Sequence, residues 1–178
     1  MPELQDHFDD LMASADSAMS VVTTAAGGER AGCLVGFQAQ CSIEPRRYVV
    51  WLSKANHTYR VGLRAVHFAV HHLTADDHDV AELFGTSSGD EIDKFTRCAW
   101  TEHPVGIPVL DRCPNRTVSR RVAILDEGSD HVCVVLEPLE ARSTGRFQPL
   151  RLSDVAHLRP GHRSEERPHP PTERSRPT

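Results

Sequence analysis

The chain has 178 residues, of which 39% are hydrophobic and 25% charged, and its formal net charge at pH 7 is -5. This length predicts one domain with a substantial core, and the negative charge argues against a general nucleic-acid-binding protein, which usually has a basic surface. No apolar run approaches the ~18 residues of a membrane-spanning helix, and the acidic start MPELQDHFDD lacks the basic and apolar regions of a signal peptide.

An amphipathic helix is the first predicted element. Leu4, Phe8, Leu11 and Met12 recur at helical spacing with acidic residues between them. We therefore expect an N-terminal helix within residues 1–17 that packs on the domain or on a partner subunit.

A β-hairpin follows this helix. Residues 18–24 (AMSVVTT) and 31–42 (AGCLVGFQAQCS) have strand character and flank a turn at 26–29 (AGGE). Gly32 and Gly36 inside the second arm indicate a bulge, a close approach to the backbone, or a strand that bends around a barrel.

Residues 48–58 (YVVWLSKANHT) join an apolar strand to a polar loop, and residues 59–66 continue with helical spacing. Unpaired N–H groups before a helix favour a phosphate, to which Lys54 would add a charge. The alternative is an ordinary helix cap made by Asn56 or Thr58. This stretch alone favours the cap.

The remaining elements predict a mainly β protein. We expect a strand at residues 68–73. A short helix is expected at residues 77–84, capped by Thr74 or Asp76 and ended by Gly85. Residues 85–116 are irregular and suit a lid or excursion over a site. Residues 118–125 and 131–139 form a second hairpin, and 163–178 are too polar to be ordered. About six strands, mostly in hairpins, predict an antiparallel barrel with helical excursions.

Common catalytic motifs do not occur in this sequence. The five cysteines (33, 41, 98, 113 and 133) are odd in number and form no CxxC pair, so we expect reduced thiols in a cytoplasmic protein. His71 and His72 point to opposite faces of one strand, and no HxH or HExxH spacing predicts a metal site. His131 begins an apolar strand, either at a pocket mouth or simply at the surface. GxGxxG, P-loop and GxSxG patterns are also missing, which leaves a bound cofactor as the source of any chemistry.

Several segments, taken in order, resemble the flavin reductase family, the FMN-binding split barrels that include reductase partners of two-component monooxygenases. The resemblance covers about residues 18–138. It is carried by MSVVTT (19–24), GCLVGFQAQCSIEP (32–45), YVVWLSKANHT (48–58), FAVHHL (68–73), AELFG (81–85), Lys94-Phe95, PVL (108–110) and GSDH (128–131).

The resemblance implies an antiparallel split β-barrel over residues 18–160, preceded by the helix in 1–17 and followed by a disordered tail at 161–178. It implies a homodimer with FMN, or FAD, near the subunit interface, reduced by NADH or NADPH without a Rossmann domain. It also implies a possible monooxygenase component as partner. His131 matches the family histidine near the nicotinamide. The flavin ring strand is matched by Leu34, Val35, Gly36, Phe37, Gln38, Gln40, Cys41 and Ser42, and the phosphate loop by Ser53, Lys54, Ala55, Asn56, His57 and Thr58.

The chain also departs from the family pattern. The family often has hydroxyl residues where this chain has Leu34, Gly36 and Gln40, and Ser129 is inserted into the family's Gly-Asp-His. One alternative is a flavin carrier without turnover on the same barrel. The departures motivate a second alternative, a dimeric ligand-binding module that has lost flavin. Haem or a deazaflavin in the same pocket is a third.

Overall fold

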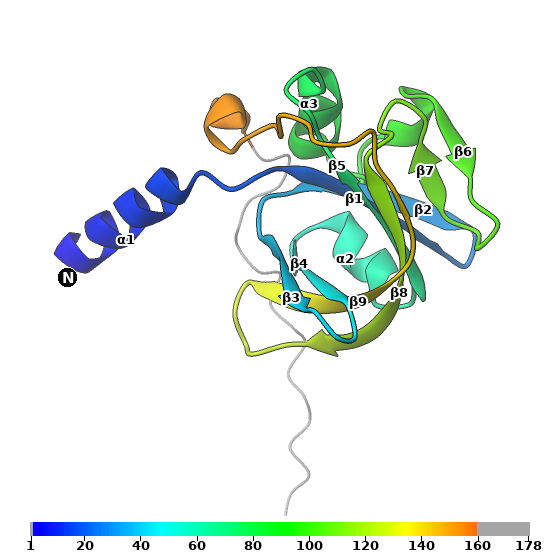
Figure 1. Ribbon diagram of the computed structural model, residues 1–178, viewed down its shortest axis with the longest axis horizontal. Helices are drawn as coiled ribbons and strands as arrows, with labels where there is room; N and C mark the ends of the chain where they lie inside the picture. Colours follow the sequence, from blue (N-terminus) through cyan, green and yellow to red (C-terminus); the bar gives the residue numbers. More distant parts are fainter. Residues whose placement is uncertain (1, 160–178) are drawn as a thin grey trace, which may run out of the picture.

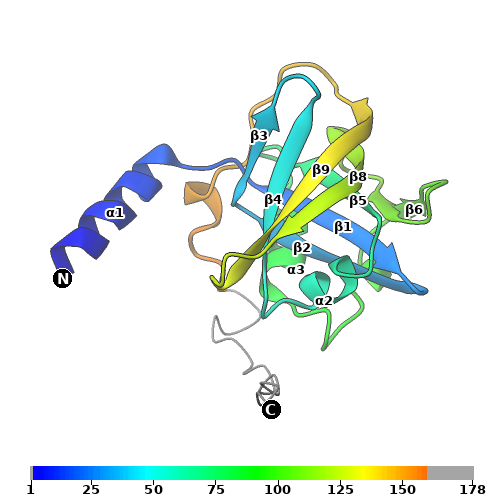
Figure 2. The ribbon, with the colours of Figure 1, turned by 90° about the horizontal axis from the view of Figure 1, so that it is seen from below.

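Seven strands form one antiparallel sheet that curls on itself, and two short strands form a separate ribbon beside it (Figures 1 and 2). The computed structural model describes residues 2–159. The strands are β1 (Ser20–Ala26), β2 (Glu29–Val35), β3 (Gln38–Ser42), β4 (Arg47–Ser53), β5 (His67–His72), β6 (Trp100–Glu102), β7 (Pro108–Leu110), β8 (Arg116–Leu125) and β9 (His131–Arg142). The helices are α1 (Pro2–Ala15), α2 (His57–Gly62) and α3 (His78–Thr86), with 3-10 turns at η1 (Lys94–Thr96) and η2 (Ser153–Val155). Within this described range, no helix has the length and apolar character needed to cross a membrane.

The curl of the sheet follows from the short link between its two edge strands. The strand order is β2-β1-β5-β8-β9-β4-β3, so β2 and β3 lie at opposite edges, yet only Gly36 and Phe37 separate them in the chain. The three peptide steps across this link reach roughly 10 Å, which forces the two edges together. We call this junction the seam. The result is the split antiparallel barrel that the sequence predicts.

The strand β1, which lies between β2 and β5 in the sheet, is buried on both of its faces. Val21 packs in a cluster beneath α3 with Phe84 and Leu150, whereas the next residue, Val22, packs inside the barrel with Phe68. Successive side chains of a strand point to opposite faces. A strand covered on both faces needs a continuous apolar or hydroxyl run, which is what residues 18–24 provide.

The expected single arm at residues 31–42 is two strands, β2 and β3. The chain turns at Gly36, where an added Cβ would lie 3.3 Å from the sulfur of Met19. The glycine therefore marks the turn at the seam, and the interpretation as one bent strand is wrong.

The helical spacing at residues 59–66 is also only partly realised. The helix α2 begins at His57 and ends at Gly62, and the apolar side chains of Leu63 and Val66 beyond it are 44% and 52% exposed. These two side chains therefore do not continue the buried face of a helix.

Residues 77–116 contain more regular structure than expected. The helix α3 continues through Gly85 to Thr86, because a glycine here allows close packing: a Cβ would lie 2.9 Å from Cδ2 of Leu34 on β2. Its N-cap is Asp77, whose carboxylate accepts from the Thr74 N–H, in place of the predicted Thr74 or Asp76. The region also holds the ribbon β6–β7, so the described residues contain nine strands instead of about six.

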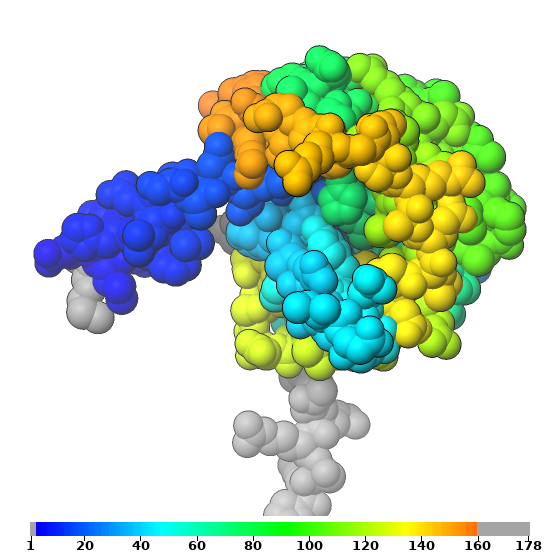
Figure 3. All heavy atoms as spheres, in the orientation of Figure 1, coloured from blue at the N-terminus to red at the C-terminus, as the bar shows by residue number. Residues whose placement is uncertain are grey.

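The helix α1 forms as predicted but does not pack on its own barrel. Figures 1 and 3 show it projecting away from the rest of the molecule. Its apolar side chains are largely exposed: Leu4 65%, Phe8 57%, Leu11 64% and Met12 47%. The prediction that this helix packs on its own domain is therefore wrong, and packing on a partner subunit stays a prediction. The predicted disordered tail, 161–178, lies outside the described residues.

Candidate functional site

The loop 53–58 is fixed by the strand at its side. Ser53, the last residue of β4, pairs with His131, the first residue of β9. The next residue, Lys54, donates its N–H to the carbonyl oxygen of Asp130 at 2.9 Å. Register between β4 and β9 thus brings the predicted nicotinamide residue His131 beside the start of the predicted phosphate loop.

Asn56 closes this loop as the N-cap of α2, as the cap interpretation predicts. Its Oδ1 accepts from the Thr58 N–H at 3.0 Å. The Thr58 side chain is buried, and its hydroxyl has no hydrogen-bond partner among the described residues. The backbone N–H groups of Ala55 and His57 also have no hydrogen-bond acceptor among the described residues. The loop therefore offers backbone donors more directly than the Thr58 hydroxyl.

Both basic side chains of the loop have carboxylate partners. Lys54 Nζ lies 2.9 Å from Asp126 Oδ1, and its side chain is only 8% exposed. The His57 ring lies between Asp90, 3.1 Å from Nδ1, and Glu29, 3.3 Å from Nε2. An anion bound to these side chains would therefore compete with carboxylates already in place.

His131 is held between an acid and an aromatic ring. Its Nδ1 lies 2.9 Å from Asp130 Oδ1, and this hydrogen bond is the main cause that lowers the pKa of the Asp130 carboxyl. The ring of Phe37 meets the imidazole edge-on, with centroids 5.2 Å apart. His131 thus connects the loop to the seam.

The predicted ring-strand residues do not share one environment. Leu34 and Val35 end β2, where Val35 is buried, whereas Phe37 at the seam is 61% exposed. Gln38 is held on both sides: its Nε2 donates to the Ala18 carbonyl oxygen at 2.8 Å, and its Oε1 accepts from the Tyr48 hydroxyl at 3.1 Å.

The β3 half of the run is more open than the β2 half. Gln40 and Cys41 are exposed and Ser42 is half-buried. The outward surface of this run is therefore the exposed ring of Phe37 together with β3.

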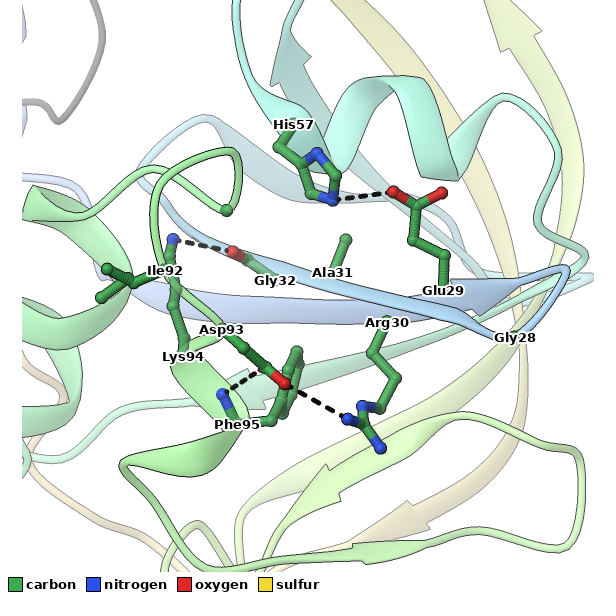
Figure 4. A pocket seen from close by; sticks show the side chains of 11 residues that line it. Gly28, Glu29, Arg30, Ala31, Gly32, His57, Ile92, Asp93, Lys94 and Phe95 are labelled. Carbon is green, nitrogen blue, oxygen red and sulfur yellow. Dashed lines mark hydrogen bonds and ion pairs between the residues drawn. The ribbon is translucent and has the colours of Figure 1, made fainter.

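A pocket of about 280 Å³ adjoins the loop on its other side (Figure 4). His57 belongs to both, and the pocket is otherwise lined by residues 28–32 of the β1–β2 turn and edge strand β2 and by Gly89 and 92–95. Gly89 lies against the His57 ring so closely that a Cβ there would be 2.7 Å from Cδ2. The excursion predicted between 85 and 116 thus does lie next to the loop. Neither Lys94 nor Gly89 is assigned to the site by the sequence alone. The only sequence signal for Lys94 is its place beside Phe95 in a segment that resembles the family.

The paired histidines of β5 face opposite sides, as expected. His71 is fully buried: its Nδ1 donates to the Val21 carbonyl oxygen at 3.1 Å, and its Nε2 accepts from the Leu110 N–H at 3.0 Å. Burial lowers the pKa of His71 to about 4. His72 is half-buried against the edge of the Tyr48 ring. In residues 2–159, no three or more His, Cys, Asp or Glu side chains gather to hold a metal ion.

Residues 12–154 match the protein family described as "Flavin reductase like domain". The chain is 30% identical over 135 residues to FMN reductase (NADH) SmoA of Agrobacterium fabrum, covering 75% of this chain and 74% of that protein. It is 26% identical over 134 residues to the reductase component of a flavin-dependent trigonelline monooxygenase of Acinetobacter baylyi. That alignment covers 75% of this chain but only 41% of the relative, so the chain spans less than half of that protein's length.

The similarity extends to solved structures. A flavin reductase domain protein from Arthrobacter sp. FB24 superposes with a TM-score of 0.73 at 18% identity, over 83% of this chain and 89% of that chain. At this identity the superposition establishes the fold alone. Because the family match spans most of the sequence, the chain belongs to the flavin reductase-like domain family.

Proposed function

We propose that this protein is an NAD(P)H-dependent flavin reductase that transfers a hydride from the nicotinamide to FMN or, alternatively, to FAD. Family membership supports the reaction class, and the 30% identical relative named an NADH-dependent FMN reductase supports FMN and NADH as the first pair to test. The observation that carries the proposal is the convergence of loop 53–58, Phe37 and His131 at one end of the barrel.

The residues at this end fit FMN. A flavin nucleotide requires donors for its phosphate and a flat, partly apolar surface for its ring. The N–H groups of Ala55 and His57, with the side chains of Ser53 and Lys54, would meet the first need. The exposed ring of Phe37 and the adjoining strand β3 would meet the second. Bound FMN would supply the hydride acceptor.

In this proposal the protein orients the two nucleotides and excludes water, without a nucleophile of its own. Lys54 would bind the phosphate in place of Asp126, and Ser53, Asn56 and Thr58 would shape the loop around it. His131, held by Asp130, would contact the nicotinamide. The proposed ring contacts come from residues 34–42 at the seam.

We also propose a homodimer in which each flavin lies near the subunit interface. The exposed apolar face of α1 supports a partner subunit, because an isolated helix of this length is only marginally stable in water. A monooxygenase component that receives reduced flavin is a further proposal, supported by the reductase component among the relatives. NADPH as an alternative to NADH, and a cytoplasmic location, stay predictions.

Absorbance spectroscopy tests the reductase directly. The purified protein is scanned with and without FMN and then mixed, without air, with NADH or NADPH. We expect flavin absorbance that bleaches with at least one of the two nicotinamides. Flavin that binds without bleaching would indicate a carrier, and a folded protein that neither binds nor reduces flavin would refute the proposal.

A further inference from the structure

Another pocket, which we call the ribbon pocket, lies between the ribbon β6–β7 and the ends of β8 and β9. Figure 1 shows the ribbon beside β8, on the side of the molecule away from α1. Because β9 begins at His131 and ends at Arg142, roughly 35 Å of strand separates this pocket from His131. Thr101, His103, Val109 and Asp111 line the pocket from the ribbon, and Arg116 and Arg142 line it from the sheet.

Arg116, at the start of β8, carries a positive charge that no carboxylate compensates. Its side chain is half-buried, and its Nη1 donates to the carbonyl oxygen of Cys113 at 3.2 Å. Its Nε is buried without a hydrogen-bond partner, and the guanidinium forms no ion pair with any carboxylate of residues 2–159. A guanidinium has five N–H donors, and a partly buried charge is costly unless an opposite charge lies nearby. Arg116 therefore has charge and donors that the described chain does not use.

Asp111, at the end of β7, supplies the opposite charge without pairing with Arg116. Its Oδ1 accepts from the Thr101 hydroxyl at 2.7 Å, and it has no cationic partner among the described residues. The adjacent side chain, Arg112, pairs instead with Asp77, 3.6 Å from its Nε. One pocket is thus lined by a cation and an anion that are not paired with each other.

The remaining charges of the ribbon pocket are compensated or point away from it. Arg142 Nε lies 2.7 Å from Glu140 Oε1, and His103 Nε2 lies 3.4 Å from Glu140 Oε2. Glu102 precedes His103 in the ribbon, so its side chain points to the opposite face. Val109 is buried and supplies an apolar surface. The pocket therefore combines one positive charge, one negative charge and an apolar wall.

The ribbon wall is fixed in place and leaves room for a small organic molecule. The Thr23 hydroxyl donates to the Pro108 carbonyl oxygen at 2.5 Å, and the Leu110 N–H donates to His71 at 3.0 Å. A wall held in this way loses little freedom when a ligand binds. The pocket volume of about 340 Å³ compares with roughly 30 Å³ for one water in the liquid. The space exceeds what a single bridging water would fill.

We propose that the ribbon pocket binds a small zwitterion, an α-amino acid with an apolar side chain. The carboxylate would accept from the guanidinium of Arg116, the ammonium group would donate to Asp111, and the side chain would lie against Val109. Both charged groups of an α-amino acid are attached to one carbon, so a single ligand compensates both charges of the pocket. Neither flavin nor nicotinamide takes part, so this inference does not rest on the proposed function.

The alternative is that water solvates both charges and that Arg116 only ties β8 to the Cys113 carbonyl. Three related molecules separate the two cases. L-leucine carries both charges, L-leucinamide lacks the carboxylate, and 4-methylpentanoate lacks the ammonium group. A zwitterion site prefers L-leucine to both analogues, whereas a solvated pocket binds none of them.

Isothermal titration calorimetry of the full chain at pH 7 measures Kd for the three molecules. We expect L-leucine to bind, and each analogue to bind about 10- to 100-fold more weakly, as for the loss of a charge-assisted hydrogen bond. No binding of L-leucine at concentrations up to about 10 mM would overturn the proposal. Equal affinity for L-leucine and either analogue would also overturn it.

Two variants place the ligand in this pocket. Asp111→Asn keeps an acceptor for the Thr101 hydroxyl but removes the charge, and it should weaken L-leucine at least about tenfold while leaving 4-methylpentanoate unchanged. Arg116→Met should weaken L-leucine similarly and leave L-leucinamide unchanged. Arg142→Met is the matched control, because its cation already has a carboxylate partner and is largely exposed; we expect less than about a twofold change.

Circular dichroism checks that each variant is folded. Asp111 is exposed, so Asp111→Asn decides the test alone if Arg116→Met does not fold. Unchanged L-leucine affinity in Asp111→Asn would overturn the proposal, as would an equal loss in Arg142→Met.

Discussion

The neutral imidazole of His71 should make the stability of the fold depend on pH. The ring donates from Nδ1 and accepts at Nε2, which only the neutral form can do. Burial lowers its pKa in the folded state to about 4, from 6.5 for the unperturbed group. The unfolded chain therefore binds a proton first as pH falls. The stability that the neutral ring contributes is complete above about pH 6.5 and is lost progressively towards pH 4.

The size of this effect follows from the pKa difference. A shift of about 2.5 units at 1.36 kcal/mol per unit corresponds to roughly 3 kcal/mol over the full range. About 2 kcal/mol of this is lost by pH 5, which is a large fraction of the stability of a typical domain.

Urea unfolding of the wild type and His71→Gln between pH 7.5 and pH 5 measures the effect. The variant is expected to be less stable at pH 7.5, because a buried hydrogen bond is lost at a cost of about 1–3 kcal/mol. The difference between the two proteins should shrink by about 2 kcal/mol at pH 5, because only the wild type must bury this titrating group. His78→Gln, at an exposed histidine of α3, is the control. A difference that stays constant with pH, or an NMR titration of His71 near pH 6.5, would refute the reasoning.

Four further substitutions test the core and the loop. Asn56→Ala should lower the free energy of unfolding by about 1 kcal/mol through loss of the α2 cap, with Asn56→Asp retaining most of it; equal urea midpoints for all three proteins would contradict this. Gly89→Ala should weaken FMN binding, because its Cβ would displace the His57 ring; an unchanged Kd in titration would argue against the contact. His131→Asn should raise KM for NADH about tenfold, as for the loss of one contact of ~1.4 kcal/mol, and leave KM for FMN nearly unchanged in steady-state assays; equal effects on both would contradict its assignment to the nicotinamide. Phe68→Ala should cost about 3–5 kcal/mol in urea unfolding; a loss below 1 kcal/mol would mean that the barrel interior collapses around the cavity.

Local patterns in the sequence predict helices and strands better than they predict which strands pair with one another. The apolar run before Ser53 predicts β4, and Asn56 predicts the cap of α2, because both depend on neighbours in the chain. The pairing of Ser53 with His131 depends on register between distant strands, which no local pattern specifies. The resemblance to the flavin reductase family, and not periodicity, placed those two segments in one site.

Other features escaped prediction for identifiable physical reasons. The strands β6 and β7 have three residues each and begin or end near prolines, so alternation has no length in which to develop. The burial of Lys94 cannot be predicted from a residue type that is almost always exposed. The apolar spacing of α1 predicts its helix correctly, but spacing carries no information about what covers the apolar face.

The strand order of the barrel has a consequence for its synthesis. The hairpins β1–β2 and β3–β4 are local in the chain, and each can form as soon as its residues leave the ribosome. The edge of β1 that faces away from β2 stays unpaired until β5 has been synthesised. The free edge of β4 stays unpaired until β9, which ends at Arg142, has been synthesised. Between the synthesis of β4 and that of β9, two unpaired strand edges are therefore exposed, joined only through the seam. A chaperone that shields such edges, or slower translation after residue 53, would be expected to change the yield of folded protein more than its final stability.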